Sequence, residues 1–185
     1  ITAYQPEDGG VTFLVNTFRG AKAQVRIRFV SPTAFRFQMF PHLAQPKLNE
    51  VFGFSPVSGV QVTEEPLFIV VKTERVTLRL RKCPWEMTVE LDGEPLTMEQ
   101  IKDHNVDQKY KAVPVGFSVG DDGRILNAFE TMYMHSDEAF YGFGEKFTSF
   151  NKRGQKITVW QQDAQSTNSD VSYKGMPYFM SSEGY

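Results

Sequence analysis

The sequence predicts a mostly β fold, an antiparallel β-sandwich with little helix. Apolar side chains recur with a period of two along much of the chain, which is the pattern of strands that bury one face. Turn signals separate these runs at roughly 8–12 residues, the spacing typical of sandwiches and barrels. Evidence for helices is confined to one short segment. Together these observations favour two packed antiparallel sheets.

Seven segments are predicted to be strands. Strict alternation of apolar and polar residues marks 24–29, 34–39, 76–81 and 86–91. Segments 11–18 and 127–134 follow the pattern less cleanly. The run Leu-Phe-Ile-Val-Val at 67–71 is apolar throughout, which predicts a strand buried on both faces.

Turn residues fit an antiparallel arrangement of these strands. Asp92-Gly93 follows an alternating run and is a strong signal for a tight hairpin. Further turns are expected at 7–10, 31–32, 55–56 and 121–123, which are rich in Gly, Pro, Asp and Ser. The one helical candidate is 97–104, with Thr97 as N-cap and Gln100 as its capping-box partner.

Composition excludes several classes of protein. The 185 residues carry 20 Lys+Arg against 22 Asp+Glu, a net charge of −2, and 41% are hydrophobic. The chain is therefore too apolar to be disordered. Its net charge is close to zero, so it lacks the excess of basic residues that is typical of nucleic-acid-binding proteins. Its longest apolar run has five residues, whereas a membrane-spanning helix needs ~20. The length predicts a single domain over residues 1–185.

The one cysteine, Cys83, excludes an internal disulfide framework and a cysteine-based zinc cluster. It stands between two predicted strands, and we interpret it as a buried structural thiol. An unpaired cysteine favours a reducing compartment, which gives a weak preference for the cytoplasm.

The sequence offers few groups for catalysis. It contains no Gly-x-Ser-x-Gly elbow, and His42, His104 and His135 lack metal-ligand spacing. We predict neither a metal nor a cofactor. His135 lies near Asp137 and Glu138, which is consistent with an acid–base cluster, although a turn with solvated charges is the preferred interpretation.

Two segments after residue 140 are unusual. Tyr-Gly-Phe-Gly-Glu-Lys-Phe at 141–147 is interpreted as a sharp turn whose aromatics pack on the core, with a ligand-directed turn as the alternative. In the run 158–163, Trp160 precedes two amides and Asp163. A Trp face stacks on a pyranose, and carboxylate or amide oxygens accept bonds from hydroxyls. The competing interpretation is a core Trp followed by a polar loop.

These segments resemble glycoside hydrolase family 31, the α-glucosidase and α-xylosidase family. The resemblance rests on five ordered blocks over the last 45 residues, namely 141–148, Asn-Lys-x-Gly-Gln at 151–155, Trp-Gln-Gln-Asp at 160–163, 172–179 and Ser-Ser-Glu-Gly-Tyr at 181–185. It implies a galactose-mutarotase-like β-sandwich that precedes a catalytic (β/α)8 barrel. The closing blocks are closer to the α-xylosidase branch.

The resemblance also implies a function. The parent enzyme would be a retaining α-glycosidase with two carboxylates, both supplied by the barrel. The nucleophile's Asp-Met-Asn-Glu-type motif does not occur in this sequence, so the fragment is expected to be inactive. The loop 145–175 would reach the barrel, with Asp163 contacting the sugar and Trp160 supporting the loop or bordering the pocket. Gln161-Gln162 departs from the family pattern, which leaves the sugar undefined.

Two alternatives to this domain hypothesis stay open. One is a free-standing carbohydrate-binding sandwich, and the other is a mutarotase-like enzyme that uses one of the histidines. The expected partners are a carbohydrate substrate and the chain's own C-terminal barrel. The resemblance further implies that the domain is truncated after Tyr185, so we expect the isolated chain to dimerise or exchange strands.

Overall fold

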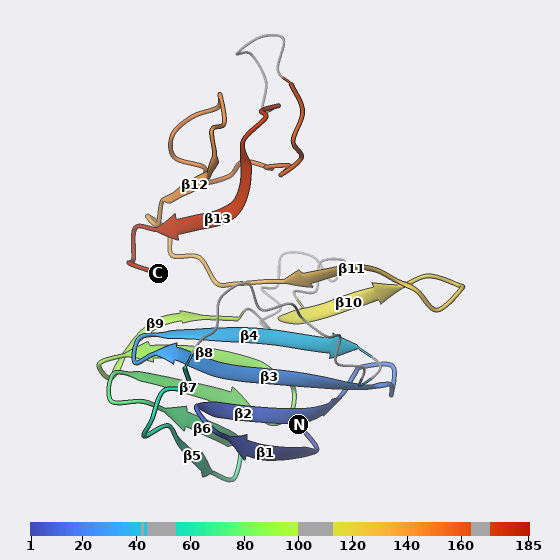
Figure 1. The fold of residues 1–185 in the computed structure, drawn as a ribbon, viewed down its shortest axis with the longest axis vertical. Helices are drawn as coiled ribbons and strands as arrows, with labels where there is room; N and C mark the ends of the chain where they lie inside the picture. Colours follow the sequence, from blue (N-terminus) through green and yellow to red (C-terminus); the bar gives the residue numbers. More distant parts are fainter. Residues whose placement is uncertain (42, 44–54, 100–112, 164–170) are drawn as a thin grey trace. The chain divides into compact units, whose positions relative to one another are not determined.

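The computed structural model describes residues 1–41, 43, 55–99, 113–163 and 171–185 (Figure 1). These residues contain thirteen strands and no helix. They divide into two compact units, Ile1–Tyr133 and Met134–Tyr185, each of which is described by itself. Every pairing between strands is antiparallel. The prediction of a mostly β, antiparallel fold is confirmed.

The first unit contains two larger sheets, in which each strand pairs with its neighbours in sequence. The four-stranded sheet comprises β1 (Ala3–Glu7), β2 (Gly10–Asn16), β3 (Lys22–Ser31) and β4 (Ala34–Pro41). The five-stranded sheet comprises β5 (Gln61–Glu64), β6 (Phe68–Lys72), β7 (Val76–Arg81), β8 (Glu86–Leu91) and β9 (Glu94–Met98). A shorter hairpin of β10 (Val115–Val119) and β11 (Ile125–Glu130) completes the unit.

The hydrophobic core is built from inward-facing side chains of both larger sheets. Its buried members alternate along the strands and are Val11, Phe13, Val25, Ile27, Phe29, Ile69, Val71, Val76, Leu78, Leu80, Met87 and Val89. Trp85 joins the two layers, because its ring lies 6.0 Å from that of Phe13 and 6.2 Å from that of Phe37. Each such large apolar side chain contributes roughly 1.5–3 kcal/mol when it is buried. The predicted sandwich is therefore present in this unit.

A buried carboxylate, that of Glu99, lies beside this core. Glu99 is 1% exposed, and its Oε2 accepts hydrogen bonds from Trp85 Nε1 at 2.7 Å and from the Met87 amide at 2.6 Å. Burial raises the pKa of Glu99 to about 7; the Met87 bond opposes this rise and the Glu130 carboxylate adds to it. The carboxyl therefore titrates near neutrality rather than in acid.

The predicted Asp92-Gly93 hairpin is confirmed. Both residues have positive φ, 53° and 92°, as a type I′ turn requires. They connect Leu91 directly to its cross-strand partner Glu94. Glycine suits the second position because it meets no steric penalty in this backbone region.

Several predicted elements differ from the structure. Leu67 precedes β6 and is 67% exposed, and within β6 only Ile69 and Val71 are buried. This strand therefore buries one face; on its other face, the guanidinium of Arg79 lies 4.7 Å from the ring centre of Phe68. An apolar run was mistaken for a doubly buried strand because arginine stems also cover apolar surface.

The helix predicted over 97–104 is wrong where the structure describes it. Thr97 lies in β9, and Glu99 forms an isolated antiparallel bridge with Met132. Residues 100–104 of that prediction lie outside the described ranges. The strand predicted over 127–134 is also displaced, because β11 spans Ile125–Glu130.

Cys83 corrects a further prediction, because it is exposed rather than buried. It lies in the turn between β7 and β8, outside the alternation by which the strands bury every second side chain. The alternation signal was too weak to identify β1, β5, β9 and β10. In the ranges described, no helix has the length and apolar character needed to cross a membrane.

Candidate functional site

The second unit is organised around one hairpin with a long connection. β12 (Phe140–Gly144) pairs with β13 (Gly175–Ser181), and the segment between them carries most of the unusual sequence. Phe140 lies opposite Ser181, and Gly142 lies opposite Phe179. A break in register follows Gly142.

Three consecutive residues with positive φ cause this break. Gly142, Phe143 and Gly144 have φ values of 119°, 66° and 83°. A Cβ at Gly142 would lie 2.6 Å from the Tyr178 carbonyl oxygen, and one at Gly144 would lie 2.0 Å from that of Lys174. Glycine is therefore required at both positions on steric as well as conformational grounds. This supports the interpretation of the motif as a sharp structural turn.

The turn also determines where the Phe143 ring lies. Its ring stacks on Phe179, with centroids 5.6 Å apart and planes 15° apart. Phe140 meets the same Phe179 ring edge-on at 5.7 Å. Because Phe140 and Phe179 share a face of the hairpin by register, the left-handed conformation of Phe143 brings a third aromatic ring to that face.

A loop held by two cationic side chains, of which Lys152 is buried, lies beside these rings. Lys152 is 7% exposed, and its Nζ donates to the Ser149 carbonyl at 2.7 Å and to Thr148 Oγ1 at 3.0 Å. Arg153 Nη1 donates to the carbonyl oxygens of His135 at 2.8 Å and Glu138 at 2.5 Å. Both cations therefore fix the conformation of the loop, mainly through backbone carbonyl oxygens.

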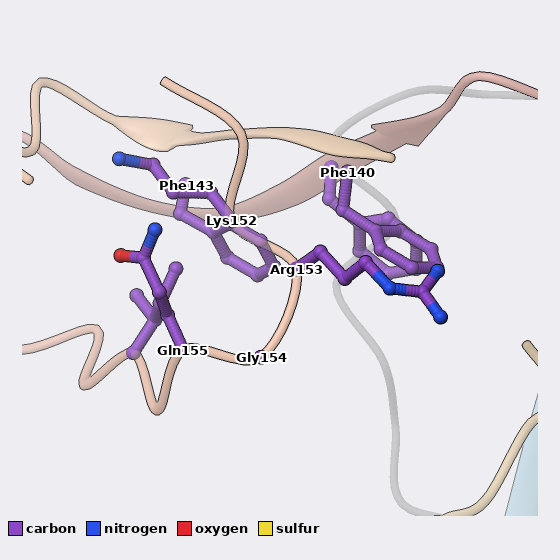
Figure 2. Close-up of a pocket in the computed structure, with 8 residues that line it drawn as sticks. Phe140, Phe143, Lys152, Arg153, Gly154 and Gln155 are labelled. Carbon is purple, nitrogen blue, oxygen red and sulfur yellow. The ribbon is translucent and has the colours of Figure 1, made fainter. Parts of the chain in front are cut away.

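The rings and the loop enclose a pocket of about 300 Å³ (Figure 2). We call it the Phe143 pocket. Its lining residues are Phe140, Phe143, Phe179 and Ile157, together with Lys152, Arg153, Gly154 and Gln155. Gln155 Nε2 donates to the Asn151 carbonyl at 2.7 Å. The walls are thus mainly apolar, and each of the three long polar side chains already binds backbone.

Glu138 is the buried acid of this unit, and the prediction of a solvated turn is wrong for it. Its side chain is fully buried, and it accepts bonds from Tyr185 Oη at 2.6 Å, from Ser181 Oγ and from the His135 amide at 3.0 Å. Burial raises the pKa of Glu138, but these hydrogen bonds together outweigh it and hold the pKa below its usual range. Glu138 therefore stays charged and fixes both ends of the unit.

The two predicted substrate-binding residues lie outside the Phe143 pocket. Trp160 is 72% exposed, so the alternative of a core Trp does not hold. Asp163 is also exposed. Between them, Gln161 forms a parallel bridge with Ser172, and the Gln162 amide donates to the Ser172 carbonyl at 3.1 Å. These bonds fix the base of the segment 164–170, which lies outside the described ranges.

Of the other groups considered for chemistry, His135 and Glu138 lie close to each other in the described part of the chain. His135 is exposed and reaches Glu138 through its backbone amide, while His42 and His104 lie outside the described residues. In the described part of the chain, no three His, Cys, Asp or Glu side chains are placed to hold a metal ion. No role was predicted from the sequence for Arg153 and Gln155, although they lie in the recognised block 151–155, nor for Ile157, which lies just after it.

A known protein family and characterised enzymes match this chain. Residues 24–185 match the family described as "Glycosyl hydrolase 31 N-terminal galactose mutarotase-like domain". The α-xylosidase XylQ of Lactiplantibacillus pentosus is 30% identical over 149 residues, which cover 80% of this chain and 18% of that enzyme. The chain thus spans less than a fifth of this relative's length.

Solved structures show the same fold. A cycloalternan-forming enzyme from Listeria monocytogenes, in complex with a pentasaccharide substrate, matches with a TM-score of 0.76 and 22% identity over 98% of this chain and 16% of that one. A family 31 α-xylosidase from Xanthomonas citri matches with a TM-score of 0.71 and 22% identity over 97% of this chain and 18% of that one. The chain belongs to the glycosyl hydrolase 31 N-terminal galactose mutarotase-like domain family.

Proposed function

We propose that this chain is the non-catalytic N-terminal domain of a retaining α-glycosidase that acts on α-linked glucosides or xylosides. The observation that carries the proposal is the family match over residues 24–185. The names of two relatives, an α-xylosidase and α-glucosidase 2 of Bacillus thermoamyloliquefaciens, agree with it. The match spans both units, and on that ground we assign both units to this one domain.

The reaction itself is assigned to the remainder of the parent enzyme. A retaining glycosidase needs two carboxyl groups about 5–5.5 Å apart. The two fully buried carboxylates described here, Glu99 and Glu138, instead accept hydrogen bonds from Trp85, Met87, Ser181 and Tyr185. Their bonding fits structural roles within the domain, and the role that we assign to the domain is support of the C-terminal (β/α)8 barrel.

The contribution of this domain to substrate binding is assigned to the loop 145–175. Trp160 and Asp163 project from a base fixed by the Gln161–Ser172 bridge. An exposed indole ring provides a face for the C–H surface of a sugar, and an exposed carboxylate accepts bonds from its hydroxyls. We assign Asp163 as a direct sugar contact and Trp160 as loop support or a border of the pocket.

Hydrolysis of p-nitrophenyl α-xyloside and α-glucoside tests this function. The full-length parent protein is expected to cleave at least one of them with retention, and residues 1–185 alone to cleave neither. An oligosaccharide that binds the 185-residue chain with micromolar affinity would instead favour a free-standing carbohydrate-binding module. Anomerisation of free sugars by this chain would favour a mutarotase-like enzyme.

A further inference from the structure

The Phe143 pocket contains a feature that strand pairing alone does not need. Phe143 is a bulky residue at φ 66°, a backbone region that such side chains rarely occupy. Strain of this kind persists where the surrounding structure enforces it, and it gathers at ligand clamps and binding sites. Here its result is a wall of the pocket, because the ring stacks on Phe179 at 5.6 Å. Phe179 is nevertheless 41% exposed.

The chemistry of the walls selects the kind of occupant. Three phenylalanine rings and Ile157 supply the apolar surface. The ammonium of Lys152, Nη1 of Arg153 and Nε2 of Gln155 are already bound to backbone carbonyls. A pyranose carries many hydroxyl groups, and each would need a partner when buried. An apolar side chain needs none, and a volume of about 300 Å³ is ample for it.

We propose that the Phe143 pocket receives an apolar side chain from the part of the parent enzyme that lies outside this domain. The inference rests on the proposed function. The chain spans 18% of the α-xylosidase XylQ and 16% of the cycloalternan-forming enzyme, so most of each relative lies outside the matched region. Protein interfaces place apolar anchors in such desolvated pockets and derive much of their energy from them. The pocket thus docks the domain onto its neighbour through residues other than Trp160 and Asp163.

Photo-cross-linking in the full-length protein tests the identity of the occupant. An aliphatic diazirine amino acid replaces Ile157, which lines the pocket, and mass spectrometry maps the products. The matched control carries the same probe at Thr158, an exposed neighbour outside the pocket lining. Cross-links from position 157, absent from position 158, to residues of the catalytic barrel of the same chain are the expected result.

Four cross-linking results would overturn the proposal. Cross-links confined to this domain would show that the domain fills its own pocket. Cross-links between isotopically distinct copies would assign the pocket to self-association, and labelling by water alone would show that solvent fills it. Suppression of cross-linking by xylose or an oligosaccharide would make the pocket a sugar site and would likewise contradict it. None of these results depends on Asp163, so they are distinguishable from failure of the proposed function.

A second measurement does not require the probe. Ile157→Gln places an amide in the apolar pocket, and Thr158→Gln places it on the exposed side of the loop. If the pocket is filled by another domain, the first variant lowers the melting temperature of the full-length protein by several degrees, and the second leaves it unchanged. Equal melting temperatures for both variants and the wild type would contradict an occupied pocket.

Discussion

Tyr185 donates a hydrogen bond from its hydroxyl to the Glu138 carboxylate, at 2.6 Å and across 47 positions of the sequence. The same carboxylate accepts a bond from Ser181, which is the last residue of β13. Glu138 therefore joins the segment before β12 to the segment after β13. A charged group buried with several donors costs much less than one buried without them.

Tyr185→Phe is expected to weaken the connection that Glu138 makes between the segment before β12 and the segment after β13. The change removes one bond to a charged acceptor, which contributes about 1.5–3 kcal/mol. Hydrogen exchange of the β12 and β13 amides measures the loss. The control is Tyr178→Phe, because Tyr178 lies on β13 and is 55% exposed. Equal protection in the two variants would show that the Tyr185 bond does not stabilise the unit.

Acid should loosen the same unit. Hydrogen bonds outweigh burial and lower the pKa of Glu138, so the folded state holds this proton less strongly than the unfolded state. The stabilisation that Glu138 contributes is therefore complete at pH values above the ordinary carboxyl pKa. It is lost as the pH falls through the lowered pKa of the folded state. Exchange protection of β13 should fall as the pH drops below the ordinary carboxyl pKa in the wild type. Glu138→Gln should be less protected at pH 7 and should lack this acid step; an identical acid step would contradict the assignment.

The buried Glu99 predicts the opposite pH dependence of stability for the first unit. Its pKa is raised to about 7, chiefly by burial, so the folded state holds the proton more strongly than the unfolded state. The stability of the first unit should therefore fall as the pH rises from about 5 to 8, by an amount on the order of 3 kcal/mol at most. Glu99→Gln should flatten this slope in urea unfolding monitored by Trp85 fluorescence. A variant with the wild-type slope would show that another group titrates.

Gly142 and Gly144 provide a steric test of the turn. Gly144→Ala places a Cβ 2.0 Å from the Lys174 carbonyl oxygen and should separate β12 from β13 at this end. Gly142→Ala should act similarly through Tyr178. Gly184→Ala is the matched control, because Gly184 also has positive φ, 92°, but no atom lies within 4 Å of the added Cβ. It should cost only about 1 kcal/mol of conformational strain. Equal effects of Gly144→Ala and Gly184→Ala on the melting temperature would contradict the steric argument.

Much of the first unit could be predicted from sequence because its sandwich repeats one local rule. Strands such as β3 and β7 bury alternate residues, and that alternation is visible in the sequence. Asp92-Gly93 similarly specifies its own turn. The burial of β6 was mispredicted because the arginine that covers Phe68 comes from the next strand, and sequence order alone does not show which face it covers.

The second unit was less predictable because its features depend on contacts between distant residues. The burial of Glu138 requires donors at 181 and 185, and the wall formed by Phe143 requires a backbone conformation that its residue type disfavours. Trp160 and Asp163 were selected by residue chemistry and by resemblance. Their exposure agrees with that selection, and their role in binding stays a prediction.

The central claim is that this domain extends a sugar-binding loop to the substrate of the full-length enzyme. The direct test is kcat/KM of Asp163→Asn in that enzyme, with Asp137→Asn as the control, since Asp137 is also exposed in the second unit. Loss of a charge-assisted hydrogen bond to the sugar predicts a decrease of about 10- to 100-fold for the first variant and none for the second. Unchanged kcat/KM for Asp163→Asn would contradict the claim.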